Sequence, residues 1–325
     1  MLLSLAHTRE ELAAAIAANE PNRAVVMTMG ALHEGHLDLL RRAGALVGAG
    51  GTVVVTIFVN PLQFAPGEDL DAYPRDLEGD VEKLRTVAEN ELQLSQLVVF
   101  APTPEVIYPS GTPQVTINPG PIATVLEGAT RPTHFGGVCQ VVLNLMHLTR
   151  PTWALFGRKD AQQLAIVRAM VRDLSVPLSI EPVDIRRESD GLAMSSRNAY
   201  LTAQEREQAL ALCHALDAGR EAARAGASAA GVRTAALRVL TRAPGVEVDY
   251  VAVVAPDSFV DMTGAGPGLP CTGVGAGAGL PASRGPVGTE RTDRPAEPAL
   301  LALAAEGGPA RLIDNAPLHR GGPVA

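Results

Sequence analysis

The sequence predicts an α/β fold built on a parallel sheet. Apolar runs of strand length at residues 23–27, 51–59 and 97–100 alternate with segments of helical spacing such as 77–91. Runs that are apolar throughout are typical of strands covered by helices on both faces. The chain has 325 residues, enough for one large or two medium domains with a sizeable core.

The remaining elements of the first domain, which we place at residues 1–178, continue this alternation. Thr8 is a candidate N-cap, with Glu10 and Glu11 in the first turn of a helix that runs to about residue 19. Later helices are expected at 37–47, 138–148 and 161–174, with a strand at 153–156.

A smaller α+β domain is expected over residues 179–325. Helices at 205–216 and 232–240 precede an alternating strand at 246–254. Residues 263–298 are dominated by Gly, Pro, Ala, Arg and Thr and cannot bury a core, so they are predicted to be loop or disordered. We interpret this low-complexity segment as an insertion or a frame-shifted stretch, with consequences for stability more than for chemistry.

The composition argues against several classes of protein. The formal net charge is −8 and the pI about 5.4, which indicates no long nucleic-acid surface. Cys139, Cys213 and Cys271 are odd in number and far apart, which argues for a reducing compartment. The start lacks the features of a signal peptide, and no apolar run approaches membrane-spanning length. We therefore expect a soluble cytoplasmic protein that binds neither nucleic acid nor membrane.

Two histidines and two glycines occur where a strand is predicted to turn into a helix, at residues 29–36. A helix start offers free backbone N–H groups that suit phosphate, and Gly30 and Gly35 allow a ligand to come close. The imidazoles of His33 and His36 can donate hydrogen bonds to phosphate oxygens. The alternative is a structural pair or a metal site, but zinc would need further ligands and no other His or Cys is suitably spaced.

Two amides follow the second predicted strand. Asn60 and Gln63 flank a turn stiffened by Pro61, so together they could recognise a small polar molecule by donor and acceptor geometry. The alternative is an Asx turn at the end of a strand.

The strand at 153–156 also ends in polar residues. Gly157 permits close backbone approach, and Lys159 supplies a point charge for phosphate. Asp160 is a plausible N-cap, and that role alone could explain an aspartate at this position. Gln163 lies one turn further on and could face the same cleft as Gln63.

Two loops precede later helices. Residues 131–137 place an arginine beside a Gly-Gly turn, and a structural role is as compatible with them as a functional one. Residues 194–197 carry two hydroxyls and an arginine, which suit a triphosphate whose leaving pyrophosphate must be neutralised. The alternative is a capping loop, because Thr202 and Glu205 form a capping box for the next helix.

Four strings, all within residues 23–202, together resemble the pantoate–β-alanine ligase family. They are Met-Gly-Ala-Leu-His-Glu-Gly-His, Phe-Val-Asn-Pro-Leu-Gln-Phe, Gly-Arg-Lys-Asp-Ala-Gln-Gln and Asp-Gly-Leu-Ala-Met-Ser-Ser-Arg-Asn, in that order. The resemblance implies a Rossmann-like parallel sheet domain of the nucleotidyltransferase group. It also implies ATP-dependent joining of pantoate to β-alanine through pantoyl adenylate, with release of AMP and pyrophosphate.

The same resemblance implies roles for residues at matching positions. His36 is the residue usually assigned as proton donor, and His33, Lys159 and Arg197 would act on the phosphates. Gln63 and Gln163 would hold pantoate, with Asn60 beside them and Gln63 also near β-alanine. The implied ATP-binding residues are Met29, Gly30, Ala31, Leu32, His33, Glu34, Gly35, His36, Gly157, Arg158, Lys159, Asp160, Arg186, Met194, Ser195, Ser196 and Arg197. Mg²⁺ is expected to bridge phosphate oxygens, with no metal ligand from the protein, and a homodimer is expected.

The chain departs from the family pattern at a few positions. Met27 stands where the family usually has proline, with little expected effect. Arg186 stands where the family commonly has valine, at a place that touches adenine. A backbone contact would survive this change, whereas a bulky charge calls the affinity for nucleotide into question.

Two other functions are weighed against the ligase. A related nucleotidyltransferase acting on a phosphorylated acceptor would need basic residues where this chain has the neutral Asn60, Gln63 and Gln163. A non-catalytic scaffold is suggested by the unusual C-terminal part, but His33 and Lys159 are intact. A tRNA synthetase is disfavoured because the chain is acidic and has no anticodon-binding extension.

Overall fold

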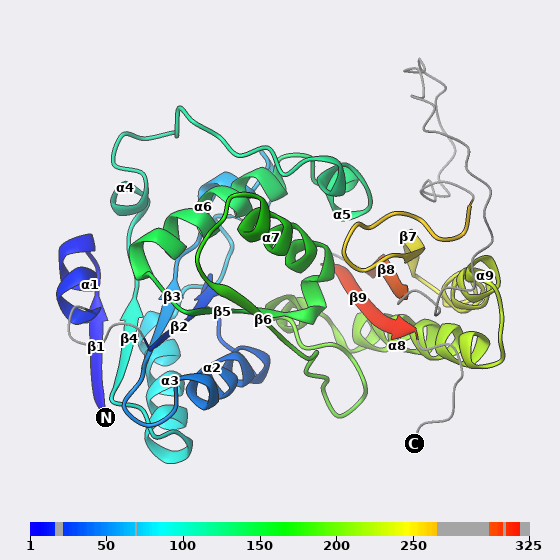
Figure 1. Cartoon of the computed structure of the whole chain (residues 1–325). Coiled ribbons are helices and arrows are strands. Elements are labelled where there is room, and N and C mark those ends of the chain that lie inside the picture. The colour runs from blue at the N-terminus through cyan, green and yellow to red at the C-terminus, as the bar shows by residue number, and fades with distance from the viewer. Residues whose placement is uncertain (17–21, 69, 265–298, 308–309, 319–325) are drawn as a thin grey trace.

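The computed structural model describes residues 1–16, 22–68, 70–264, 299–307 and 310–318, and a six-stranded parallel sheet forms its larger part (Figure 1). The strand order is β1-β4-β3-β2-β5-β6. The strands are β1 (Leu2–Ala6), β2 (Arg23–Thr28), β3 (Thr52–Ile57), β4 (Gln96–Phe100), β5 (Trp153–Gly157) and β6 (Ser179–Val183). The order reverses between β2 and β5, and in open parallel sheets ligands bind at the carboxyl ends of strands beside such a reversal.

Helices cover both faces of this sheet. The helices α1 (Arg9–Ile16), α6 (His134–Thr149) and α7 (Ala161–Asp173) pack on one face, and α2 (Glu34–Val47) and α3 (Leu77–Glu91) on the other. Successive residues of β2 alternate between the two cores, because Val25 belongs to the first and Ala24 and Val26 to the second. Burial on both faces explains why the central strands are apolar throughout.

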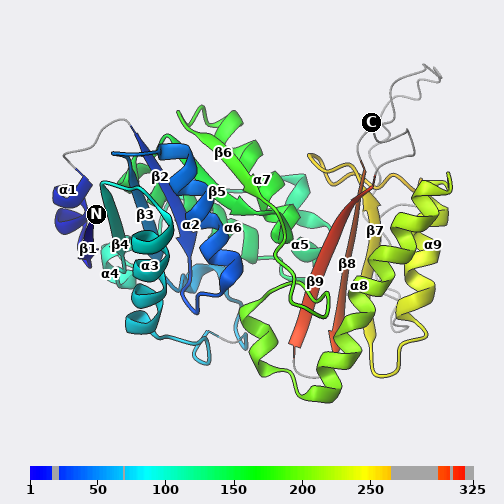
Figure 2. The same ribbon diagram turned by 90° about the horizontal axis from the view of Figure 1, so that it is seen from below.

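A second, three-stranded antiparallel sheet lies at the other end of the molecule (Figure 2). Its elements are α8 (Ala203–Arg224), α9 (Ala229–Leu240), β7 (Glu247–Val254), β8 (Ala299–Gly307) and β9 (Ala310–Leu318). One face of the sheet packs on α8 and α9. The opposite face, including Tyr250 and Ala302, packs against Leu126 and Ala165 of the larger domain. The sheet is thus covered on both sides.

Short helical turns occupy the connections around the first sheet. They are η1 (Pro61–Gln63), α4 (Pro104–Ile107), η2 (Pro121–Thr124), α5 (Glu127–Thr130), η3 (Arg158–Asp160) and η4 (Ser196–Tyr200). Over the ranges described, no helix combines the length and the apolar character needed to cross a membrane.

The predicted α/β architecture with a smaller α+β domain is confirmed. The helix predicted at 77–91 has those bounds, and Thr8 accepts a hydrogen bond from the backbone N–H of Glu11 as an N-cap should. The predicted end of the first helix near residue 19, and residues 265–298 of the low-complexity segment, lie outside the described residues. Cys139 and Cys213, the two cysteines within them, are free thiols.

Two edge strands, β1 and β6, were not predicted. Both are half-covered, so neither shows the continuous apolar run of the central strands. β6 pairs in parallel with β5 from Ser179 to Val183. The parallel sheet therefore continues beyond residue 178, where the boundary of the first domain was expected.

A buried arginine ties the start of β2 to the ends of two helices. Arg23 is 1% exposed, and its guanidinium donates to the carbonyls of Thr149 (2.8 Å) and Arg150 (3.3 Å) at the end of α6. It also donates to the carbonyl of Ile16, the last residue of α1, at 2.6 Å. Carbonyls at helix ends lack hydrogen-bond donors within the helix, and the guanidinium of Arg23 supplies those donors.

We expect Arg23→Met to lower the free energy of unfolding by about 2–4 kcal/mol, because buried carbonyls would lose charge-assisted hydrogen bonds. Urea denaturation measures the change. Arg42→Met is the matched control: Arg42 is a surface arginine paired with Glu181, and its removal should cost less than about 1 kcal/mol. Equal effects of the two substitutions would contradict the role assigned to Arg23.

Candidate active site

A continuous cleft opens at the carboxyl ends of β2, β3 and β5. It consists of two adjoining hollows, one of about 240 Å³ and one of about 220 Å³, each many times the space of one water molecule. The residues shared by both hollows include Met29, His36, Lys159, Asp160, Gln163, Ser195 and Arg197. Segments far apart in the sequence therefore face one space, beside the reversal of strand order.

The two histidines hold each other in place at the start of α2. His33 is the N-cap, and its Nδ1 accepts from the backbone N–H of Gly35 at 3.1 Å. The Nδ1 of His36 accepts from the backbone N–H of His33 at 3.3 Å, and the ring centroids are 4.0 Å apart. A Cβ on Gly35 would lie 3.0 Å from the His33 ring, so glycine gives that ring its room.

This reciprocal cap defines the tautomer of both rings. Burial, together with the neighbouring His33 and Lys159, lowers the pKa of His36 to about 3. Burial and Lys159 also lower the pKa of His33. Both imidazoles are therefore neutral near pH 7, and since each Nδ1 accepts a hydrogen bond, each Nε2 carries the proton.

A buried carboxylate supports the turn from behind. Asp80, 1% exposed on α3, accepts from the backbone N–H of Leu32 at 2.8 Å. Lys83 lies 3.5 Å from Asp80 and donates to the Leu32 carbonyl at 2.9 Å. Both backbone groups of Leu32, its N–H and its C=O, are therefore hydrogen-bonded to side chains of α3, just before the histidine pair.

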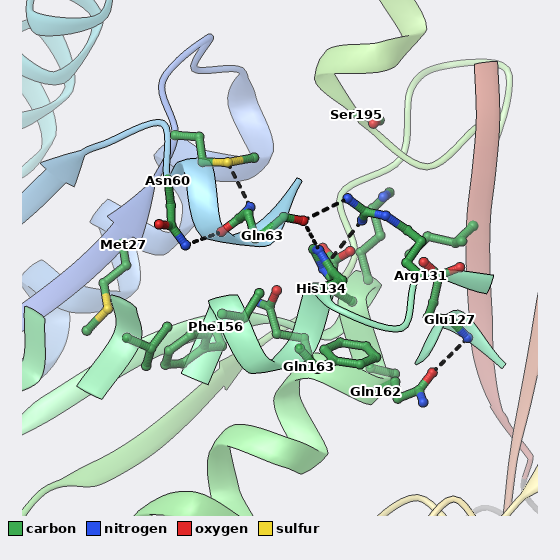
Figure 3. A pocket seen from close by; sticks show the side chains of 18 of the residues that line it. Met27, Asn60, Gln63, Glu127, Arg131, His134, Phe156, Gln162, Gln163 and Ser195 are labelled. Carbon is green, nitrogen blue, oxygen red and sulfur yellow. Dashed lines mark hydrogen bonds between the residues drawn. The ribbon is translucent and has the colours of Figure 1, made fainter. Parts of the chain in front are cut away.

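Asn60 is fully occupied by contacts within the protein, and Figure 3 draws the one to Gln63. Its Oδ1 accepts from the backbone N–H of Leu62 (3.3 Å) and from the Tyr108 hydroxyl (3.0 Å). Its Nδ2 donates to Gln63 Oε1 (3.3 Å) and to the Gly137 carbonyl (3.1 Å). With 1% exposure and four partners, Asn60 has no capacity left for a ligand.

Gln63 lies at the wall of the cleft and is oriented by its neighbours. Asn60 supports its Oε1, and its Nε2 donates to Met29 Sδ at 2.9 Å, a weak acceptor. Across the cleft, Gln163 on α7 makes no side-chain hydrogen bond within the described part of the chain, and it lines both hollows. Gln63 and Gln163 are therefore the amides with capacity to spare.

Arg131 and His134 extend the polar wall around Gln63 (Figure 3). His134 Nδ1 donates to the Gln63 carbonyl at 3.0 Å, and Arg131 donates to the same oxygen at 3.3 Å. Arg131 also forms a two-point ion pair with Glu68, which holds its guanidinium in place. Burial lowers the pKa of His134 to about 4, so this ring is neutral as well.

Gly137, the second glycine of the Gly-Gly pair, has a packing role. A Cβ on Gly137 would lie 2.2 Å from the Leu62 carbonyl oxygen. The start of α6 can therefore rest directly on η1 only because this residue has no side chain. The two glycines predicted to form a helix-entry turn lie within the first turn of α6, which begins at His134, and only Gly137 makes this close contact.

The turn after β5 presents one cation and one carboxylate. Lys159 lines both hollows and forms no ion pair with any residue of the described ranges. Asp160 precedes α7 but makes no capping hydrogen bond through its side chain, contrary to the simple N-cap interpretation. Gly157 has open space where a Cβ would be, which leaves its backbone accessible.

The loop that carries Ser195 and Arg197 is anchored on both sides. Asn198 donates to Glu188 Oε1 (2.7 Å) and to the Ala193 carbonyl (3.0 Å). Arg206 on α8 binds both Glu188 and Asp190. The capping box predicted for Thr202 and Glu205 is also present, so the loop is both a capping segment and a wall of the cleft.

The charge of Arg186 lies beside α2. Its guanidinium lies 3.3 Å from Asp38 and 3.9 Å from Glu34, two carboxylates on α2. Its carbonyl accepts from the backbone N–H of Met194 at 2.9 Å. The acidic residues of α2 thus draw the bulky cation toward that helix.

The structure brings most of the predicted site residues together, with some exceptions. Ala31, Leu32, Glu34 and Arg158 do not line either hollow of the cleft, and Gly30 lines a separate pocket beside Asp80. Arg158 is paired with Asp184 and Glu34 with Arg41. These residues belong to the turns that border the cleft without lining it.

Other cleft residues were not predicted as site residues. Arg131 and His134 lie in the segment 131–137, for which the sequence is equally compatible with a structural and a functional role. Tyr250, Arg311, Asp314 and Asn315 come from β7 and β9 and line the larger hollow. Arg311 is held by Glu127 and Asp249. No local signal marks these β-strand residues, because their place in the cleft comes from domain packing.

The comparison with known proteins identifies the family. A family model described as pantoate-beta-alanine ligase matches residues 4–317. A pantothenate synthetase of Nocardioides sp. is 45% identical over 323 residues, covering 98% of this chain and 86% of that protein. One from Streptomyces avermitilis is 45% identical over 368 aligned positions, covering 99% of both.

Solved structures agree. A pantothenate synthetase from Thermus thermophilus has a TM-score of 0.76 and 40% identity, covering 96% of this chain and 98% of that one. A pantoate-beta-alanine ligase from Francisella tularensis, complexed with beta-gamma ATP and beta-alanine, has a TM-score of 0.68 and 26% identity, covering 97% of each. On the combined weight of the family match, the relatives and the fold, this chain belongs to the pantoate–β-alanine ligase family.

Proposed function

We propose that this chain catalyses the reaction for which its family is named, the ATP-dependent condensation of pantoate with β-alanine to pantothenate, with release of AMP and pyrophosphate. The observation that carries the proposal is a convergence of groups in one cleft. Hydrogen-bond donors and cations suited to a triphosphate meet two amides that keep hydrogen-bonding capacity for a small acid. The relative from Francisella tularensis, complexed with beta-gamma ATP and beta-alanine, supports the same substrates here.

The nucleotide is assigned to the smaller hollow and its rim. Three predicted segments and Arg186 border this space. The residues among these that line it are Met29, His33, Gly35, His36, Gly157, Lys159, Asp160, Arg186, Met194, Ser195, Ser196 and Arg197. The Nε2–H groups of His33 and His36, the Lys159 ammonium and the Arg197 guanidinium are the donors for phosphate oxygens. Because Arg186 is drawn toward α2, its backbone rather than its charge is assigned to adenine.

The first chemical step joins pantoate to the nucleotide. A carboxylate oxygen of pantoate attacks the α-phosphorus, and the bond from that phosphorus to pyrophosphate breaks. Negative charge grows on the α-phosphate oxygens and on the leaving pyrophosphate, where fixed donors lower the barrier. With a pKa near 3, the His36 ring does not carry a second proton at neutral pH, so we assign it hydrogen-bond donation through Nε2 rather than proton transfer.

Pantoate is assigned to Gln63 and Gln163. These amides have free hydrogen-bonding capacity, and an amide can serve both the hydroxyls and the carboxylate of pantoate. Asn60 is assigned a supporting role, because its four contacts orient Gln63 and leave nothing for a ligand. This replaces the direct contact to pantoate expected from the sequence.

The second step forms the amide. The neutral amine of β-alanine attacks the acyl carbon of pantoyl adenylate, the bond to the AMP oxygen breaks, and one proton leaves the nitrogen. Gln63 also borders the space for β-alanine. Neither step needs a nucleophile from the protein, so catalysis rests on positioning and charge neutralisation.

Mg²⁺ is proposed to enter with the phosphates of the nucleotide. Across the described ranges, no cluster of three or more His, Cys, Asp or Glu side chains could hold a metal by itself. Asp160 lines both hollows and makes no capping bond, so it is the carboxylate best placed beside a phosphate-bound ion. When bound, the ion would neutralise phosphate charge.

We also propose that the protein works as a homodimer in the cytoplasm. The family resemblance supports the dimer, and the scattered cysteines and ATP as a substrate support the compartment.

The reaction itself is tested with purified protein, ATP, pantoate and β-alanine. AMP should appear only when both acids are present, and pantoyl adenylate should be trapped when β-alanine is omitted. Pantoate-dependent exchange of labelled pyrophosphate into ATP reports the first step alone. AMP formation without pantoate, or no exchange, would refute the assignment.

We expect His36→Ala to slow pyrophosphate exchange by roughly 10²-fold or more, the scale of losing one donor to the transition state. Two further variants separate this donor from the cap. Asn can contact the His33 N–H but cannot reach outward, so His36→Asn should be as slow as His36→Ala. Gln can reach the position of Nε2, so His36→Gln should retain part of the rate. If His36→Asn were instead faster than His36→Gln, the loss of rate would come from the damaged cap of α2 and not from the missing Nε2 donor.

We expect Gln63→Ala to raise the KM for pantoate by roughly 10- to 100-fold, because one hydrogen bond to a charged group is worth about 1.5–3 kcal/mol. The KM for ATP should be little changed. Gln63→Glu preserves the shape but places a negative charge beside the acid, so it should be worse still. A lower ATP affinity with unchanged pantoate affinity would show that the acid site is misplaced.

A further inference from the structure

The last strand of the small domain holds the turn that carries Lys159. Asn315 on β9 is 5% exposed, and its Nδ2 donates to the carbonyl of Arg158 at 2.9 Å and to the carbonyl of Lys159 at 2.8 Å. Both carbonyls belong to η3, between β5 and α7. One amide group therefore pins two successive peptide units of this turn from 156 residues further along the chain.

The preceding residue holds the loop on the other side of the cleft. Asp314 accepts from Arg187 through both oxygens, at 2.7 and 2.9 Å, and its side chain is 1% exposed. Arg187 also donates to the Gly191 carbonyl at 3.0 Å and forms a β-bridge with Ala193. This arrangement closes the base of the loop that continues into Ser195 and Arg197.

Neighbouring residues of one strand can serve two segments because their side chains point to opposite faces. The backbone N–H of Asn315 donates to Asp314 Oδ1 at 2.8 Å, which links the two contacts. Since β9 pairs with β8 along its full length, Asp314 and Asn315 are held by a rigid element. β9 therefore sets the distance between η3 and the base of the loop at Arg187.

We propose that Asp314 and Asn315 are positioning residues for the adenylation step, Asn315 by fixing Lys159 and Asp314 by fixing the loop with Ser195 and Arg197. The inference rests on the proposed function, since it assigns those groups to the triphosphate. It gives the small domain a part in chemistry as well as in covering the cleft. Neither residue needs to touch a substrate.

Loss of Asn315 and loss of Asp314 should disturb different segments, and both should affect adenylation more than pantoate binding. Without the Asn315 donors, the carbonyls of Arg158 and Lys159 lose their buried partners and η3 can shift. Without the Asp314 charge, Arg187 is left without its partner and the loop base loosens. Either shift misplaces a phosphate donor while leaving Gln63 and Gln163 untouched. Adenylation should therefore suffer and pantoate binding should not.

The test uses the full chain with four variants. Asn315→Asp is isosteric but lacks the donors, and Asn315→Ala removes them without adding a charge. Asp314→Asn preserves shape and removes the charge. Leu303→Val is the control: Leu303 is a buried residue of β8 that pairs with Asp314 in the core of the small domain, and its apolar side chain takes no part in the hydrogen bonds to the turn or the loop. It should lower the melting temperature without touching either contact.

The kinetic readout is pantoate-dependent pyrophosphate exchange, measured well below the melting temperature of each protein. Each Asn315 and Asp314 variant should lose at least roughly tenfold in rate, the scale of one charge-assisted hydrogen bond, with an unchanged KM for pantoate. Leu303→Val should keep the wild-type rate. Wild-type rates in the Asp314 and Asn315 variants, or an equal loss in Leu303→Val, would overturn the proposal.

Hydrogen exchange provides a readout that does not depend on activity. Faster amide exchange should appear at residues 157–163 in Asn315→Ala and at residues 186–198 in Asp314→Asn, with neither change in Leu303→Val. Uniform exchange changes across the small domain would refute the positioning role even if activity falls. If the wild-type protein lacks pyrophosphate exchange but these localised changes appear, the contacts stand and the proposed reaction fails.

Discussion

The reciprocal cap between His33 and His36 is the interaction on which the site depends. Each Nδ1 accepts a backbone N–H at the start of α2, so both rings are oriented by the same hydrogen bonds that begin the helix. Burial lowers the pKa of both rings, and they remain neutral donors. Neutral rings can lie 4.0 Å apart without the repulsion that two imidazolium ions would suffer. Asp80 and Lys83 hold the preceding residue, so the turn is fixed before any ligand arrives.

The polar residues of the cleft fall into two kinds. Some make all their hydrogen bonds within the protein, and others keep donors or acceptors for a ligand. Asn60 and Gln162 are buried amides whose hydrogen bonds all go to the protein; Gln162, for example, joins the Glu127 N–H to the carbonyls of Ile122 and Val125. Gln63 and Gln163 keep capacity for a ligand. Arg131 is likewise committed to Glu68, whereas Lys159 forms no ion pair with the residues described. A polar residue at the end of a strand is therefore a binding residue only when its neighbours leave its donors and acceptors free.

The small domain is built into the site through β7 and β9. One face of its sheet packs on α8 and α9, while the other lies against the larger domain and contributes Tyr250 and Arg311 to the cleft. Arg311 bridges Glu127 of the first domain and Asp249 of the second, and it lies 5.9 Å from the Tyr250 ring centroid. Changes in β7 or β9 therefore bear on the cleft as well as on stability.

The sequence by itself determined the parallel sheet, the bounds of α3, and the groups at strand ends, namely His33, His36, Gln63 and Lys159. These features are encoded by neighbouring residues: apolar runs, helical periodicity, caps and glycines. Tertiary structure alone decided that β1 and β6 join the sheet, since half-covered edge strands have no strong pattern. It also decided that Asn60 is saturated and that Asn315 reaches Lys159. Those outcomes depend on contacts between residues far apart in the chain, and such contacts leave no trace in the local pattern of either partner.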